Sequence, residues 1–270
     1  MMVIKVGGGA GIDLDSVAGD VAELWREGRR LVLVHGGSHL TNELAAALGH
    51  EPQFIHSPSG YTSRYTDRRT LEIFEMVYCG QVNKGLVERL QARGTNAIGL
   101  SGLDGGLWQG PRKEAIRALL QDGRQRIVHD SLTGRVERVN VALLNGLLDD
   151  GYLPVLTPPA LSFDGQAINV DGDRAAAATA VALGASNFII LSNIPGVLAR
   201  FPDEESLIPA IAAADLPRVS EEAARGRMRV KLLAAQEALA GGVDCVVIGD
   251  ARGANAIPQA LQGVGTVIRR

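Results

Sequence analysis

The segment MVIKVGGGAGID, residues 2 to 13, joins a short apolar run to a glycine-rich turn that opens a helix near Asp13. A strand that ends in glycines exposes backbone N–H groups at the carboxyl edge of a sheet, where α/β proteins present their ligands. These N–H groups and the start of the following helix both favour an anion. The segment therefore predicts an α/β fold with a phosphate site after its first strand.

The same alternation of strand and helix continues along the chain. Apolar runs typical of buried strands lie at 3–6, 31–35, 96–100, 153–157, 187–192 and 244–249. Amphipathic stretches typical of helices lie at 15–27, 41–48, 67–92, 172–183 and 228–240. Buried strands separated by helices pair in parallel and are covered on both faces. We therefore expect an α/β three-layer sandwich with a mainly parallel central sheet.

Two features interrupt this alternation. Segments 125–129 and 135–139, joined by the turn-forming residues 130–134, predict an antiparallel hairpin beside the first half of the chain. Pro158-Pro159, followed by Asp164-Gly165, indicates a boundary between two lobes. We expect an N-terminal lobe over residues 1–165 and a C-terminal lobe over residues 166–270.

Composition excludes several classes of protein. The chain has 270 residues, 46% of them hydrophobic, and a formal net charge of -3, so overall charge gives no support for binding to nucleic acid or to a membrane surface. No apolar stretch approaches the ~20 residues of a membrane span, and the first residues do not form a secretory signal. Cys79 and Cys245 lack a Cys-x-x-Cys partner or nearby histidines, which favours two buried, reduced thiols in a cytoplasmic protein.

The phosphate site does not match two common motifs. The chain has no G-x-x-x-x-G-K-[ST] segment, and its first glycine turn departs from G-x-G-x-x-G, which argues against a P-loop enzyme and a dinucleotide dehydrogenase. Instead, Lys5 precedes the glycines, and two more strands end in small or polar residues at 34–38 and 191–196. Plain tight turns remain the alternative for the glycines. The chain has 27 basic residues but only four lysines, so each lysine is a candidate for a compact point charge.

Six short motifs now identify a resemblance that covers essentially the whole chain. They are Lys5-Val6-Gly7-Gly8, Val34-His35-Gly36-Gly37, Arg64-Tyr65-Thr66-Asp67, Asn169-Val170-Asp171-Gly172-Asp173, Leu191-Ser192-Asn193 and residues 226–231. Their order and spacing resemble those of the acetylglutamate kinases. Stretches 61–69 and 169–174 are most similar to the kinases that act on aminoadipate or glutamate carried on LysW, a small acidic amino-group carrier protein.

Three positions depart from the acetylglutamate kinase pattern. Ser38 replaces a third glycine, Asp171-Gly172 replaces the more usual Asn-Ala, and Asn193 replaces an Asp. These differences concern the substrate more than the reaction.

The resemblance implies the amino-acid kinase, or carbamate kinase-like, fold. It also implies an ATP-dependent kinase that converts a side-chain carboxylate to an acyl phosphate in lysine or arginine biosynthesis. The implied catalytic residues are Lys5, Lys231 and Asp173. Substrate binding is implied for Gly36, Gly37, Arg64 and Asn169, and nucleotide binding for Lys5, Gly8, Ser192, Asn193 and Lys231. The family's Mg²⁺ is held mainly by phosphates, so no protein metal ligand is expected. A carboxylate acceptor is ionised at pH 7 and needs no general base.

For three of these residues the sequence leaves a structural alternative open. Lys231 is also compatible with a solvated helix residue, Asp173 with a helix N-cap, and Asn169 with a turn at a strand end. Two other functions also remain open. One is an N-acetylglutamate kinase of arginine biosynthesis, and the other is a non-catalytic amino-acid-binding regulator with the same fold.

The resemblance also implies partners. A homodimer is expected, because the first strand begins at Met2 without the preceding helix that joins dimers in hexameric relatives. Between Arg112 and Arg138 the chain has seven basic and four acidic residues, a local charge of +3, and Arg64, Arg68 and Arg69 against Asp67 add +2. A basic rim suits an acidic carrier protein that presents the substrate, although a solvated hairpin would show the same excess.

Overall fold

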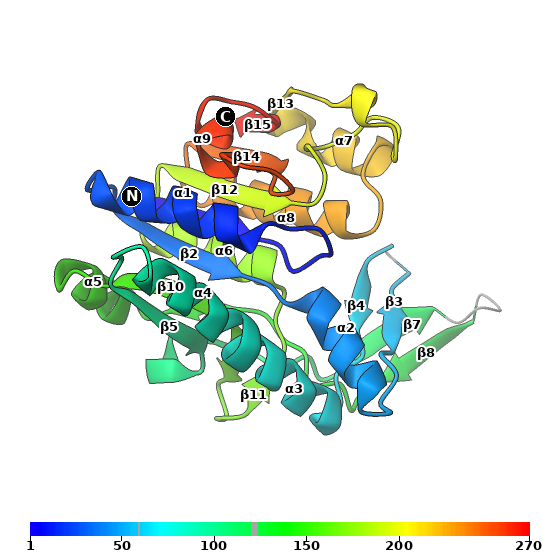
Figure 1. The fold of residues 1–270 in the computed structure, drawn as a ribbon. Coiled ribbons are helices and arrows are strands. Elements are labelled where there is room, and N and C mark those ends of the chain that lie inside the picture. The colour runs from blue at the N-terminus through cyan, green and yellow to red at the C-terminus, as the bar shows by residue number, and fades with distance from the viewer. Residues whose placement is uncertain (59, 120–123) are drawn as a thin grey trace.

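A computed structural model describes residues 1–58, 60–119 and 124–270 of the chain. One sheet runs through the molecule in the order β13-β15-β14-β12-β1-β2-β10-β6-β9, with β5 and β11 also paired to β10 (Figure 1). Its strands are β1 (Met2–Val6), β2 (Leu31–His35), β5 (Ala97–Gly102), β6 (Trp108–Gly110), β9 (Arg138–Val139), β10 (Leu153–Ser162), β11 (Ala167–Ile168), β12 (Asn187–Ser192), β13 (Ala210–Ala212), β14 (Cys245–Asp250) and β15 (Thr266–Arg269).

Most neighbouring strands in this sheet are parallel, which confirms the predicted sheet type. The antiparallel pairs are β14 with β15, β10 with β11 and β6 with β9. β1 lies between β2 and β12 and is parallel to both, with Val6 opposite His35 on one side and Leu191 on the other. The carboxyl ends of β1, β2 and β12 therefore meet at one edge, where the glycine turns follow.

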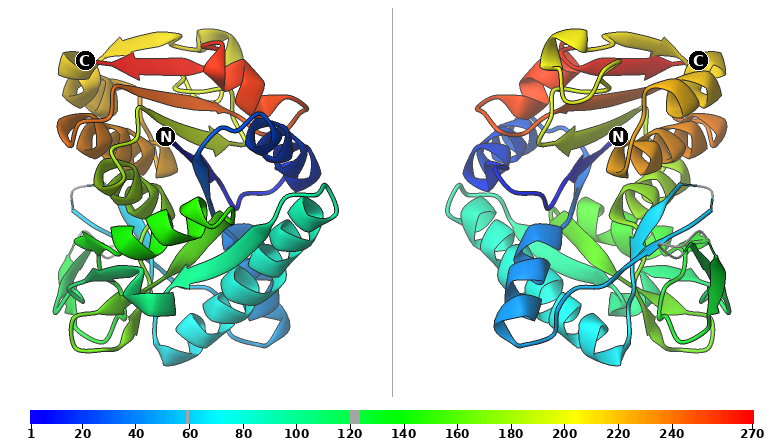
Figure 2. Two further views of the ribbon diagram at one scale, coloured as in Figure 1. Left: turned by 90° about the vertical axis from the view of Figure 1, so that its left-hand side faces the viewer. Right: turned by 90° about the vertical axis from the view of Figure 1, so that its right-hand side faces the viewer.

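Helices cover both faces of the sheet, as the edge-on views of Figure 2 show. On one face lie α1 (Leu14–Arg26), α3 (Arg68–Glu75), α4 (Asn83–Gln91) and α9 (Ala256–Leu261). On the other lie α5 (Val141–Asp149), α6 (Gly172–Ala182), α7 (Leu216–Glu222) and α8 (Arg227–Ala240). Alternate side chains of β1 enter opposite cores, with Val3 on the α6 face and Ile4 on the α1 face. The predicted three-layer sandwich is therefore confirmed.

The helix predicted over residues 67–92 is helical throughout but not uniform. A π-helical turn, Met76–Val82, separates α3 from α4. Such turns widen a helix locally and are frequent at functional sites. Here the widened turn carries the buried Tyr78, and a Cβ atom placed on Gly37 would lie 3.1 Å from its ring. α2 (Ser38–Ala47) begins directly after that glycine.

The hairpin predicted from segments 125–129 and 135–139 is wrong. β8 (Gln125–Val128) pairs instead with β7 (Ile116–Leu119), and β9 pairs with β6. Turn-forming residues between two β-like segments indicate a change of direction but do not choose the partner strand. Residues 130–134 form a loop that bonds to Asn169, since the Asn169 N–H donates to Leu132 and Gly134 donates to the Asn169 carbonyl.

Three further features complete the fold. β3 (Phe54–His56) and β4 (Thr62–Arg64) form a separate antiparallel ribbon beside α2 (Figure 1). Cys79 and Cys245 are free thiols, but both are half-buried, not fully buried as predicted. Among the described residues, no helix combines the length and apolar character needed to span a membrane.

Candidate active site

The carboxyl ends of β1, β2 and β12 open into a cavity of about 700 Å³. Its walls come from the glycine turns, β4, the segment around Asn169 and the starts of α6 and α8. Nine of the ten predicted site residues line it: Lys5, Gly8, Gly36, Arg64, Asn169, Asp173, Ser192, Asn193 and Lys231. The tenth, Gly37, lies beside it against Tyr78. Residues separated by more than 220 positions in the sequence thus meet in one site.

Two lysines share one aspartate in the wall of this cavity. The Lys5 Nζ atom lies 2.5 Å from Asp173 Oδ1, and the Lys231 Nζ atom lies 2.9 Å from Asp173 Oδ2. Each of the three side chains is only 7–8% exposed. This arrangement, here called the Lys-Asp-Lys bridge, joins β1 to α6 and α8.

Small residues in α6 and α8 make the bridge possible. Ala175, Ala176 and Ala177 of α6 and Ala234 and Ala235 of α8 are buried, so the two helices can pack closely. Asp173, in the first turn of α6, and Lys231, one turn into α8, then face each other. The solvated-helix alternative for Lys231 is therefore wrong.

The N-cap alternative for Asp173 is also wrong. The cap of α6 is Asp171, whose side chain accepts the backbone N–H of Arg174 at 2.9 Å. With its helix capped by another residue, the Asp173 carboxylate is directed to the two ammonium groups.

Burial and neighbouring charge shift the pKa values of the bridge residues in opposite directions. Burial alone would raise the pKa of Asp173, but the ammonium groups of Lys231 and Lys5 outweigh it and hold that pKa below its ordinary value. Burial lowers the pKa of Lys231, and Asp173 partly offsets this effect. Two ammonium groups share one carboxylate, so these three buried side chains together carry an excess positive charge that would attract an anion.

The two glycine turns touch each other. A Cβ atom on Gly8 would lie 2.2 Å from the Gly37 nitrogen and 2.5 Å from the Gly36 carbonyl carbon, so a side chain at position 8 has no room. The Gly36 N–H donates to the Val6 carbonyl at 3.0 Å, so it is not available to a ligand in this structure. Gly36 therefore lets the backbone lie close to the cavity, but it does not offer a free N–H donor to a ligand.

Arg64 closes the opposite wall, at the end of β4. One of its terminal nitrogens, Nη2, donates to Asn42 Oδ1 and lies 3.5 Å from the Ser38 carbonyl. The guanidinium also stacks 5.2 Å from the centre of the Phe54 ring. Its other terminal nitrogen, Nη1, is buried and has no hydrogen-bond partner among the described residues. Burial lowers the pKa of Arg64, and a carboxylate in the cavity would satisfy the open donor.

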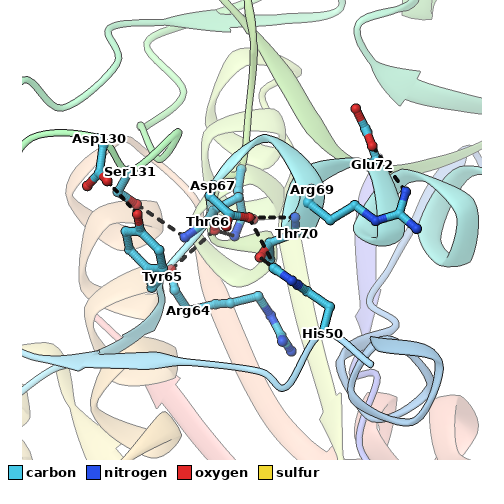
Figure 3. A network of polar contacts seen from close by, with 11 residues as sticks. His50, Arg64, Tyr65, Thr66, Asp67, Arg69, Thr70, Glu72, Asp130 and Ser131 are labelled. Carbon is cyan, nitrogen blue, oxygen red and sulfur yellow. Dashed lines mark hydrogen bonds and ion pairs between the residues drawn. The ribbon is translucent and has the colours of Figure 1, made fainter. Parts of the chain in front are cut away.

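A network of polar contacts connects Arg64 to its surroundings (Figure 3). Tyr65 donates to Asp130 at 2.6 Å, and this hydrogen bond raises the pKa of Tyr65 to about 12. Asn169 donates through Nδ2 to the Thr66 hydroxyl at 3.0 Å. Asn169 does follow a strand end, β11, but its side chain also lines the cavity, so the two interpretations of this residue are compatible.

The nucleotide residues predicted at the end of β12 lie across the cavity from Arg64. Asn193 donates to the Ala10 carbonyl at 3.3 Å and so ties this strand end to the first glycine turn. Beyond Ser192 the cavity wall becomes apolar, with Ile194, Leu198 and Phe201. The described residues contain no group of three or more His, Cys, Asp or Glu side chains suited to hold a metal ion.

Sequence analysis missed two residues that contact the second glycine turn. Tyr78 lines the cavity from the π-helical turn, and in the sequence it is hidden within an apolar helical stripe. Arg227, at the start of α8, donates to the Ser38 hydroxyl at 2.9 Å and links the second glycine turn to the C-terminal half. The serine at position 38 was the available signal, because a glycine there could not accept this bond.

Comparisons with known proteins agree with this geometry. Residues 1–250 match the model of the amino acid kinase family. The chain is 58% identical over 268 residues to a [LysW]-aminoadipate kinase from Deinococcus radiodurans, covering 99% of this chain and 91% of that protein. It is 55% identical over 270 residues to the [LysW]-aminoadipate kinase from Thermus thermophilus, covering all of both chains.

A solved structure gives the same result for the fold. The N-acetylglutamate synthase from Neisseria gonorrhoeae, complexed with coenzyme A and N-acetyl-glutamate, matches with a TM-score of 0.78 and 27% identity. The match covers all of this chain and 59% of that one. The predicted family and fold are confirmed, and the chain belongs to the amino acid kinase family.

Proposed function

We propose that this protein transfers the γ-phosphoryl group of ATP to the side-chain carboxylate of 2-aminoadipate, or of glutamate, carried on the protein LysW. The observation that carries the proposal is the buried Lys-Asp-Lys bridge facing a cavity whose opposite wall has an open arginine donor. The choice of substrate rests on the two relatives with 55–58% identity over the full chain.

The proposed reaction needs cations and alignment more than proton transfer. A carboxylate oxygen of the acceptor forms a bond to the γ-phosphorus, the bond from that phosphorus to the β,γ-bridging oxygen breaks, and ADP leaves. Negative charge spreads over the transferring oxygens, and fixed cations stabilise it. Lys5 and Lys231 supply these cations, and Asp173 holds them in register.

The cavity divides into an ATP side and an acceptor side. We assign ATP to the C-terminal lobe, residues 166–270, where Lys231, Ser192 and Asn193 would face the phosphates and the apolar wall at Ile194 and Leu198 would contact the base. Gly8 would approach the phosphates from the first glycine turn. Mg²⁺ would be held mainly by the phosphates of ATP, since both Asp173 oxygens already face lysines.

The acceptor side belongs to residues 1–165, together with Asn169. Arg64 would hold a carboxylate of the acceptor through its open Nη1, and Asn169 would orient the substrate. Gly37 and Gly36 would form the floor next to Tyr78. Arg64 suits this role better than a lysine would, because its planar fork can hold one partner while it presents a second donor.

The acidic carrier would approach over the basic residues predicted between 112 and 138. Arg117, Arg124 and Arg126 are all exposed. Arg117 is paired with Ile127 and Arg126 with Ala118, so the two arginines project from opposite faces of the β7–β8 hairpin. Arg135 already pairs with Glu137 at 2.6 Å, and Asp122 lies outside the described residues. Ile127, on the same face as Arg117, is 56% exposed, whereas Ala118, on the same face as Arg126, is buried. We therefore assign the carrier to the solvent-facing side of the hairpin, the face with Arg117.

The other two functions have less support. An N-acetylglutamate kinase would use the same bridge, and the structural similarity to a synthase complexed with N-acetyl-glutamate favours it as the second candidate. A non-catalytic regulator has no evident need for two buried lysines on one aspartate.

The deciding experiment traps the product. Acyl phosphates react with hydroxylamine, so the enzyme with ATP, Mg²⁺ and LysW-linked aminoadipate should give a hydroxamate, and N-acetylglutamate should give much less. Efficient turnover of N-acetylglutamate would instead favour the second candidate. A stable phosphoester would contradict phosphorylation of a carboxylate, and no turnover of any acceptor would favour the regulator.

We also propose that the protein forms a homodimer through the helical segment of α3, the π-helical turn and α4. Met76 is 51% exposed on this segment, an unusual exposure for a large apolar side chain beside a packed core. Sedimentation equilibrium should give twice the 28.5 kDa mass of the chain. A monomer or a hexamer would contradict this assignment.

A further inference from the structure

We propose that the Thr66 hydroxyl is a positioning group that fixes the side chain of Asn169 and the backbone of Arg64 as one acceptor-binding unit. The inference rests on the proposed function and assigns a role to a residue that does not itself line the cavity. Thr66 is fully buried, at 0% exposure, two residues beyond the end of β4.

The hydroxyl makes two hydrogen bonds to the two predicted substrate-orienting residues. Its Oγ1 donates to the Arg64 carbonyl at 3.2 Å and accepts from Asn169 Nδ2 at 3.0 Å. Arg64 and Asn169 belong to segments more than 100 residues apart, and this one oxygen connects them. Figure 3 shows Thr66 at the centre of the network, with the Arg64 side chain extending away from it.

The direction of these bonds follows from the number of hydrogens available. A threonine hydroxyl carries one hydrogen, and here that hydrogen is given to the Arg64 carbonyl. The oxygen can then only accept from Asn169, so the NH₂ group of the carboxamide must face Thr66. If the Asn169 amide were rotated by 180°, its carbonyl oxygen would face the Thr66 hydroxyl oxygen, and neither would have a hydrogen to donate. The Asn169 carbonyl oxygen and second N–H are therefore held in one orientation for the substrate.

The backbone of Thr66 is anchored independently of its hydroxyl. Its N–H donates to Ser131 Oγ at 3.3 Å, and its carbonyl accepts the Leu132 N–H at 2.6 Å. Asn169 is bonded to the same loop through its own backbone. Removal of the hydroxyl alone should thus leave the three segments in place and release only the carboxamide and the Arg64 carbonyl.

Thr66→Val is the direct test, because valine has nearly the same shape and lacks the hydroxyl. A buried donor and a buried carbonyl lose their partner, which predicts a loss of about ten-fold or more in kcat/KM for the carrier-linked acceptor. KM for ATP should not change, because the ATP side of the cavity has no contact with Thr66. Thr66→Ser retains the hydroxyl and should keep most of the activity.

Thr70→Val is the matched control. Thr70 is also buried and its hydroxyl also has a polar partner, His50 Nε2 at 2.9 Å, but this bond does not reach Asn169 (Figure 3). The same chemical change there should lower the melting temperature by a similar amount and leave kcat/KM within about two-fold of the wild type. Equal activity losses in the two variants would show that Thr66 acts only through general stability, and would overturn the inference.

A double-mutant cycle tests whether Thr66 acts through Asn169. In an Asn169→Ala background the Thr66→Val change should have little further effect on kcat/KM, whereas independent roles would give multiplied losses. If Thr66→Val does not fold, Thr66→Ala removes the same hydroxyl and completes the cycle. Wild-type turnover of the carrier-linked acceptor, measured in parallel, tests the proposed function separately. An inactive wild type overturns both, while an active wild type with additive losses overturns only the role of Thr66.

Discussion

The Lys-Asp-Lys bridge and the Arg64 side chain face the same cavity, but the protein satisfies their charges differently. Both carboxylate oxygens of Asp173 have an ammonium partner within 3 Å, and all three groups are attached to a central strand or to packed helices. Arg64 lies at the end of a two-stranded ribbon, and its Nη1 donor is left without a partner among the described residues. The first region is complete before any ligand binds, whereas the second leaves one donor open.

The difference fits the two tasks of a kinase. Transition-state stabilisation requires charges that are already in position, because reorganisation during the reaction would cost free energy. Recognition of an acceptor requires donors that are still open. The same contrast extends outward from the cavity. His35 has protein partners for both ring nitrogens, while Arg117 and Arg126 of the β7–β8 hairpin are exposed.

The largest effect should follow removal of either lysine of the bridge. Lys5→Ala and Lys231→Ala should each lower kcat by about 10²- to 10³-fold, the loss expected for one preorganised transition-state contact, with a smaller change in KM. Steady-state kinetics with both substrates measures this. Lys84→Ala is the control, since that exposed lysine donates to the Gly99 carbonyl outside the cavity. A rise in KM alone would make the lysine a ground-state binding group.

The stability of the folded protein should depend on acid through His35, another buried group whose polar atoms are already paired. The Asn83 amide donates to its Nε2 atom, so Nδ1–H donates to the Gly36 carbonyl, and burial lowers the pKa of His35 to about 4 from an ordinary value of 6.5. As the pH falls, the unfolded chain takes up a proton near 6.5 and the folded protein only near 4. The neutral His35 therefore contributes fully to the free energy of unfolding above pH 6.5. This contribution falls by about 3 kcal/mol as the pH is lowered from 6.5 to about 4.

Urea unfolding at pH 7 and pH 4.5 measures this loss. His35→Gln, which cannot be protonated, should be less stable at pH 7 but should lose less on acidification than the wild type. His129→Gln provides the comparison, because His129 is exposed. Equal acid sensitivity of the wild type and His35→Gln would assign the loss to other groups.

A smaller effect is expected at Arg64. Arg64→Lys keeps a positive charge but loses the planar fork, so KM for the acceptor should rise about 10- to 30-fold, in line with loss of one charge-assisted hydrogen bond. KM for ATP should stay near the wild-type value. Isothermal titration with the acceptor and with ATP separates the two sides of the cavity. Weakened ATP binding in this variant would place Arg64 on the nucleotide side instead.

The smallest effect is expected at the solvent-facing rim. Arg117→Glu should raise KM for the carrier-linked acceptor about three- to ten-fold at low salt, and the effect should shrink near 0.5 M salt as screening increases. Arg29→Glu makes the same change of net charge at an exposed residue away from the cavity and should have no such effect. An effect of Arg117→Glu that does not depend on salt would argue against electrostatic steering by this face.

Some contacts required knowledge of the tertiary structure. The resemblance implied substrate binding for Gly36, but the N–H of this residue donates to the Val6 carbonyl beside the paired strands β1 and β2. Arg227 and Tyr78 reach the acceptor side from a helix start and from a π-helical turn. Neither has a local pattern that separates it from an ordinary helix residue.

The sequence by itself determined the alternation of strands and helices, the carboxyl edge that holds the site, and nine of the residues in the cavity. Those features follow from local rules: apolar periodicity, glycines after strands, and short motifs in a recognisable order. Only the tertiary structure decided which strands pair around residues 116–139, which groups of the site are already paired, and how Thr66 connects Arg64 to Asn169. Such contacts depend on how separate segments pack against one another, and hydrogen-bond geometry depends on ångström-scale positions that no local pattern specifies.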